Sequence, residues 1–141
     1  VAHGYLHSAL PNLPLWIDEG LAEYFEVPRG LGGMNQPHVE LLSDSITHDS
    51  WKPNLKRLES LTDSGQMDQR DYAESWAWVY FMLHSPPERR ELLTGYLADL
   101  HAKGSATPLS TRLAELELAP EQPLTKYIAT LKQDVAVRSL K

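Results

Sequence analysis

The chain has 141 residues, of which 42% are hydrophobic and 23% charged, and this length and composition are typical of one globular domain with its own core. A net charge of −6 without a cluster of lysine or arginine argues against nucleic acid or an anionic membrane as a partner, and no apolar run approaches the roughly 18 residues of a membrane span. Because the chain contains no cysteine, it can form no disulfide, and any bound metal must rely on histidine and carboxylate ligands.

Prolines and glycines divide the chain into helical segments. Pro11 and Pro14 end a helix over the first ten residues, because proline lacks the N–H group and disfavours helical geometry in the residue before it. Pro28–Gly33 is a loop, since no strand precedes it and its glycines lack the spacing of a phosphate-binding motif. The other expected helices are 16–26 with Asp18 as an alternative start, 38–48, 54–61 entered at Pro53, a long helix that ends before Pro86, 88–103, 110–118 and 121–131.

The long helix follows a turn at Thr62–Gln66, and either Asp68 or Asp71 is expected to cap it. Gly104 is expected to end the helix over residues 88–103. Alternating apolar and polar runs with hairpin dipeptides are absent, so the sequence predicts a single all-α domain. The inward stripe predicted for the long helix consists of Tyr72, Trp76, Val79, Tyr80 and Leu83.

Two histidines near the start of the chain have the spacing of metal ligands. His3 and His7 stand four residues apart, so on a helix both imidazoles lie on one face and can bind one ion. A carboxylate from the next helix, Glu19, would complete three protein ligands and leave the fourth position of a tetrahedral Zn²⁺ open to water. In the H-E-x-x-H pattern the glutamate after the first histidine is the general base, and here that position is Gly4.

The histidine pair is followed by Leu15-Trp-Ile-Asp-Glu-Gly-Leu-Ala-Glu-Tyr-Phe25. Together they resemble the gluzincin metallopeptidases, above all the aminopeptidase-like branch and its bacterial (peptidase MA-like) relatives, over roughly residues 1–100. The resemblance implies a zinc-dependent peptidase in which this block supplies the third ligand. It also implies that Tyr72, which opens the long helix, donates its hydroxyl to the oxyanion of the tetrahedral intermediate; the alternative is a core aromatic.

This chain departs from the family pattern in two places. The spacer between His7 and Glu19 holds eleven residues, fewer than in the aminopeptidases proper. Gly4 has no side chain to move a proton, so weak or absent peptidase activity is expected. Glycine also weakens a helix by about 0.5–1 kcal/mol relative to alanine, so stability does not explain it. A natural pseudoenzyme and a laboratory substitution both remain open as its origin.

Glu23 lies one turn after Glu19 and can accept the second ring N–H of a metal-bound histidine, which fixes the tautomer of that histidine. A role for Glu23 as replacement base is less suitable, because a base must reach the metal-bound water. The remaining histidines lack a partner at ligand spacing, so nothing in the sequence selects one for the site. They are His38, His48, His84 and His101.

Residues 1–141 are therefore expected to form one helical, zincin-like peptidase domain that acts on or binds a peptide or protein. The histidine helix has to begin at or before Val1, so this chain is expected to be the downstream part of a longer protein, with the β-sheet portion upstream. The alternatives are a non-catalytic module that holds a peptide or protein in the old cleft, with or without metal, and a plain helical scaffold.

Overall fold

A computed structural model describes residues 10, 12–28 and 30–139, and their regular secondary structure is entirely helical, as predicted. The helix expected over residues 1–10 lies almost wholly outside this part of the chain. The helices are α2 (Leu15–Phe25), α3 (Gln36–His48), α4 (Leu55–Glu59), the short 3₁₀ helix η1 (Ser64–Gln66), α5 (Gln69–His84), α6 (Pro87–Lys103), α7 (Leu109–Leu116) and α8 (Glu121–Ser139).

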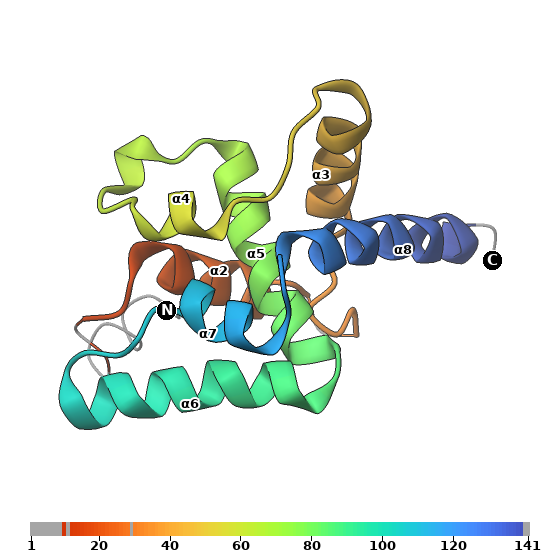
Figure 1. Cartoon of the computed structure of the whole chain (residues 1–141). Helices are drawn as coiled ribbons and strands as arrows, with labels where there is room; N and C mark the ends of the chain where they lie inside the picture. The colour runs from red at the N-terminus through yellow and green to blue at the C-terminus, as the bar shows by residue number, and fades with distance from the viewer. Residues whose placement is uncertain (1–9, 11, 29, 140–141) are drawn as a thin grey trace.

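Helix α5 runs through the middle of the molecule, and α2, α3, α6 and α8 pack around it (Figure 1). Helix α7 packs on α6, and α8 also contacts α3. The largest buried side chains come from α2 and α5, and they include Trp16, Trp76, Trp78 and Phe81. Among the helices of the described ranges, none combines the length and apolar content that crossing a membrane requires.

The predicted start of α5 and the predicted end of α6 are confirmed. At the start of α5, the side chain of Asp68 accepts a hydrogen bond from the backbone N–H of Asp71 at 2.9 Å, and the Asp71 carboxylate accepts one from the Asp68 N–H at 3.2 Å. Both aspartates named as alternatives therefore share the cap, each satisfying a backbone group of the other. Gly104 ends α6 with a φ of 74°, a left-handed conformation that glycine adopts without a Cβ clash.

Several predicted boundaries are wrong: α3 begins at Gln36 and not at residue 38, and α7 ends at Leu116 and not at residue 118. Helix α4 covers only Leu55–Glu59 and starts at Asn54, whose side chain accepts the Arg57 N–H at 3.1 Å, so the helix is not entered at Pro53. Helix α8 continues to Ser139 instead of stopping at residue 131. The apolar repeat continues past that point, because the buried positions of α8 follow helical spacing and include Val135.

Helices α2 and α5 approach each other closely at Gly20. A Cβ atom at this position would lie 2.6 Å from the backbone oxygen of Ser75 and 2.9 Å from Cγ2 of Val79. Only a residue without a side chain fits between the two backbones. This contact sets the register of α2 against α5, and with it the relative position of the residues that precede Gly20 and Ser75.

Gly20→Ala is expected to destabilise the fold by about 1–3 kcal/mol, because a methyl group forced into a packed contact shifts the backbone. Urea denaturation measures the change in the free energy of unfolding. Gly95 on α6 provides the matched control, since its added Cβ would meet only Arg112 Nη1 at 3.9 Å. Gly95→Ala should raise stability by about 0.5–1 kcal/mol through helix propensity. Equal effects at both positions would contradict the packing argument.

Candidate functional site

The structure describes three of the six predicted site residues. His3, Gly4 and His7 lie in the segment 1–9, outside the described residues. Glu19 and Glu23 are on α2, and Tyr72 is in the first turn of α5; all three side chains are partly exposed. The helices that carry them are the pair that is held together at Gly20.

Packing explains most of the sequence block on α2. Trp16, Gly20 and Ala22 are buried, whereas Glu19 and Glu23 are only partly covered. The buried residues of this block are thus the ones that pack against α5. The core does not require the side chains of the two glutamates, so packing does not explain why they are in the block.

Tyr72 lies within the electrostatic field of both glutamates. Burial raises the pKa of the Tyr72 hydroxyl, and the negative charges of Glu19 and Glu23 raise it further, because they disfavour a phenolate beside them. The phenol of Tyr72 is therefore protonated at neutral pH and can donate a hydrogen bond. In the folded chain Glu19 and Glu23 on α2 therefore act on the hydroxyl of Tyr72 on α5.

His38, which nothing in the sequence selected, belongs to the same region. Its Nε2 atom lies 3.5 Å from Oε1 of Glu23, and its ring centroid is 5.8 Å from that of Trp76. Burial lowers the pKa of His38, and the neighbouring carboxylate of Glu23 opposes this effect. The separation of 3.5 Å is long for a hydrogen bond, so the two groups form a loose pair across α2 and α3.

The glycine-rich loop after α2 is fixed against α5. The indole N–H of Trp76 donates a hydrogen bond of 2.8 Å to the backbone oxygen of Gly33. Gly33 has a φ of 84°, and a Cβ there would lie 2.4 Å from the ring of Tyr24. The hydroxyl of Tyr24 is in turn 2.7 Å from Nε2 of His84, which stacks on Tyr80 with ring centroids 4.1 Å apart. The hydrogen bond from Trp76 and the close approach of Tyr24 therefore hold this loop against α5 and α2, next to Glu23.

A cavity of about 460 Å³ lies at the C-terminal end of α2, and we name it the α2-end cavity. Glu23 is one of its lining residues, so the cavity adjoins the candidate site. Two large apolar side chains are exposed at this end of the helix, Phe25 at 66% and Leu31 at 48%. The residues that line the α2-end cavity are Glu23, Glu26, Val27, Pro28, Leu31, Met34, Asn35, Gln36 and Pro37.

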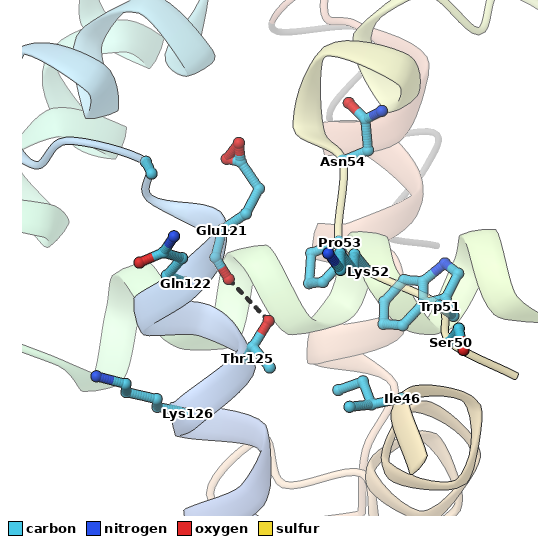
Figure 2. Close-up of a pocket in the computed structure, with 11 residues that line it drawn as sticks. Ile46, Ser50, Trp51, Lys52, Pro53, Asn54, Glu121, Gln122, Thr125 and Lys126 are labelled. Carbon is cyan, nitrogen blue, oxygen red and sulfur yellow. Dashed lines mark hydrogen bonds between the residues drawn. The ribbon is translucent and has the colours of Figure 1, made fainter. Parts of the chain in front are cut away.

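A cavity larger than the α2-end cavity, about 920 Å³, lies elsewhere. Figure 2 shows Trp51 and Pro53 from the α3–α4 connection on one side, and Gln122 and Thr125 from the first turns of α8 on the other. None of the residues proposed from the sequence for the site lines this cavity. This larger cavity is therefore not part of the candidate site around Glu19 and Glu23.

The described residues hold only part of a metal centre. Within residues 10, 12–28 and 30–139, no three His, Asp or Glu side chains are grouped closely enough to bind a metal ion. Glu19 can supply one oxygen ligand, and a three-ligand zinc site needs two more, which the sequence assigns to His3 and His7. The nitrogen and oxygen donors of this set match the preference of Zn²⁺.

A buried carboxylate outside the site was not anticipated from the sequence. Glu74 on α5 is 2% exposed, and its Oε2 atom accepts hydrogen bonds from the Asn54 backbone N–H at 2.7 Å and from Trp78 Nε1 at 3.1 Å. Burial raises the pKa of Glu74 to about 7, against the lowering effect of both hydrogen bonds. Its position on the buried side of α5 explains this value, and a single glutamate in a helical sequence gives no signal of it.

The fold and these groups define an all-α domain with two glutamates, a histidine and a tyrosine on adjoining helices. The model of one family, described as a protein of unknown function (DUF1570), matches residues 3–105, and the chain belongs to this family. The matched segment contains all six residues selected from the sequence and ends before α7 and α8. Among curated proteins and solved structures, no match to the chain was found.

Proposed function

We propose that this chain is a zinc metallopeptidase-like domain in which His3, His7 and Glu19 hold Zn²⁺. The observation that carries the proposal is the joint placement of Glu19, Glu23 and Tyr72 by α2 and α5. In the proposed site Glu23 accepts the second ring N–H of a metal-bound histidine. In the structure the Glu23 carboxylate lies 3.5 Å from the imidazole of His38, which is not one of the proposed ligands, so the proposed site needs Glu23 to accept from a second histidine as well.

Zinc, when bound, polarises a peptide carbonyl and lowers the pKa of its water to near 7. The protein contributes the donor to the developing oxyanion. Tyr72 suits this task, because a phenol is protonated at neutral pH and the raised pKa of Tyr72 keeps it so at higher pH as well. A neutral donor held by a helix before the reaction begins needs no reorganisation during it.

Gly4 limits what this site can do as a peptidase. The missing glutamate would contribute proton transfer worth typically 10²–10⁴-fold in rate. Neither Glu19 as a ligand nor Glu23 as a partner of histidine is free to replace it. The domain is therefore expected to bind zinc and peptide while hydrolysing peptide bonds weakly or not at all.

The α2-end cavity supports a second candidate function, that of a pseudoenzyme or peptide-binding module without catalysis. Apolar side chains line much of the cavity, and Phe25 and Leu31 are exposed at the end of α2. Exposed apolar side chains beside a cavity are typical of a surface that binds a partner. This function needs the cavity but not the metal.

The purified chain is expected to contain about one zinc per molecule, measured by mass spectrometry of the metal after mild purification. His3→Ala, His7→Ala and Glu19→Gln should each lower the zinc content at least about tenfold, because each removes one of three ligands. Glu115→Gln is the control, since Glu115 is an exposed glutamate on α7 away from the site. Zinc should also raise the melting temperature of the wild type, because binding to the folded state stabilises it.

A zinc-free protein that still binds peptide would favour the binding module over the metallopeptidase-like site. Unchanged stability with zinc and with chelator, together with no peptide binding, would reduce the domain to a scaffold.

A further inference from the structure

We propose that the α2-end cavity receives a lysine or arginine side chain, so that the bound peptide is basic. The peptide nature of the ligand rests on the proposed function. The preference for a cation rests on the cavity itself, and it concerns binding, which can be measured without zinc and without turnover.

The walls of the α2-end cavity are largely apolar. Val27, Pro28, Leu31, Met34 and Pro37 contribute to them. Lysine and arginine have long aliphatic stems that pack along such surfaces while their charged ends stay in contact with polar groups. A cavity of about 460 Å³ has room for such a side chain together with part of the peptide backbone.

The charged residues that the described part of the chain contributes to the cavity wall are both acidic. Glu23 and Glu26 line it, and none of its described lining residues is a lysine or arginine. The Glu26 side chain forms no hydrogen bond or ion pair within the described part of the chain, whereas Glu23 has His38 at 3.5 Å. Glu26 therefore has a carboxylate available for a cation from outside.

The end of a helix adds to this attraction. Glu26 is the C-terminal cap residue of α2, and the C-terminus of a helix carries a partial negative charge. The chain as a whole has a net charge of −6, which favours the approach of a basic ligand. Two carboxylates, a helix C-terminus and apolar walls together match a side chain with an aliphatic stem and a cationic end, and they disfavour an acidic one.

The cavity also has a defined place relative to the candidate site. Glu23 lines the cavity and lies one turn from Glu19, the proposed zinc ligand. A side chain bound in the cavity would therefore belong to a peptide residue near the metal. This position would make the α2-end cavity a determinant of which peptides the site accepts.

The test uses fluorescein-labelled hexapeptide pools in which one position is fixed and the others carry mixed apolar residues. Arginine, its uncharged analogue citrulline and glutamate are compared at the fixed position by fluorescence anisotropy, with chelator present so that zinc plays no part. The arginine pool is expected to bind the wild type about tenfold or more tightly than the citrulline pool, since hydrogen bonds to charged groups contribute more than neutral ones. The glutamate pool should bind most weakly.

Two variants separate charge from apolar contact. Glu26→Gln should abolish the preference for arginine over citrulline, while Glu115→Gln, with the same change of charge on α7, should keep it. Leu31→Ser should weaken the arginine and citrulline pools equally, because it removes an exposed part of the apolar wall without changing a charge. Circular dichroism and urea denaturation confirm that each variant is folded.

Equal binding of the arginine and citrulline pools, binding that Glu26→Gln leaves unchanged, or no binding of any pool would overturn the inference. These results are independent of the zinc content. A protein that binds zinc but shows no preference for arginine keeps the proposed function and loses this inference. A protein that binds no zinc but prefers arginine keeps this inference and loses the proposed zinc site.

Discussion

Gly4→Glu is expected to raise the rate of peptide hydrolysis by about 10²–10⁴-fold over the wild-type chain, the usual contribution of a general acid–base group. The substitution restores H-E-x-x-H over residues 3–7 and places a carboxylate next to the first proposed ligand, His3. Glutamate also favours a helix more than glycine does, so the change should not lower stability. The effect belongs to kcat, because the base acts in the transition state.

The measurement is cleavage of a broad, quenched-fluorescent peptide library with zinc in slight excess. Gly4→Gln is the matched control, since it adds a side chain of nearly the same shape without a base. Tyr72→Phe in the Gly4→Glu background should reduce the gained activity about 10²–10³-fold, as loss of one oxyanion donor does. A Gly4→Glu protein that binds zinc yet cleaves no peptide would show that the peptidase assignment is wrong.

Glu74→Gln is expected to stabilise the fold by up to roughly 3 kcal/mol above pH 7, and to change it little near pH 4.5. Burial raises the pKa of Glu74 from 4.5 to about 7, so in this interval the folded chain binds more protons than the unfolded one. The contribution of Glu74 to stability is therefore present at the acidic end and is lost as the pH rises through about 7. Glutamine stays neutral, and its side-chain oxygen can accept the same two hydrogen bonds.

Urea denaturation of wild type and variant between pH 4.5 and 8.5 measures this difference. Other groups titrate in the same range, among them His38 and His84, whose pKa values are lowered chiefly by burial. They are present in both proteins and cancel in the comparison. Glu115→Gln should show no such pH-dependent gain. A Glu74→Gln protein that is less stable than wild type at pH 8 would mean that the ionised carboxylate is favourable in this environment.

Much of the fold follows from local signals in the sequence. The cap formed by Asp68 and Asp71 and the stop at Gly104 each act within a few residues, and the structure has both where the sequence predicts them. The end of α8 was misplaced because its apolar repeat extends across more polar positions after Leu131. Helix α4 is capped by Asn54 and is not entered at Pro53. The side-chain oxygen of Asn54 accepts a hydrogen bond from the Arg57 backbone N–H, and a proline side chain has no such acceptor.

The site was only partly predictable, since its groups come from different helices. Glu19 and Tyr72 were found through the ordered motif and Glu23 through its helical spacing from Glu19, and the effect of both glutamates on Tyr72 depends on how α2 packs on α5. The pairing of His38 with Glu23 and the burial of Glu74 have no counterpart in residue spacing. The His38–Glu23 pair and the burial of Glu74 both depend on contacts between segments that are far apart in the sequence, and the apolar repeat of a single helix does not reveal such contacts.

The narrow contact at Gly20 also governs how this molecule can move. Backbones that meet without an intervening side chain cannot slide past each other without a steric collision, so α2 and α5 behave as a single rigid body. The loop after α2 is tied to the same body by the hydrogen bond from Trp76 to Gly33. Glu19 and Tyr72 would therefore keep their separation when a ligand binds.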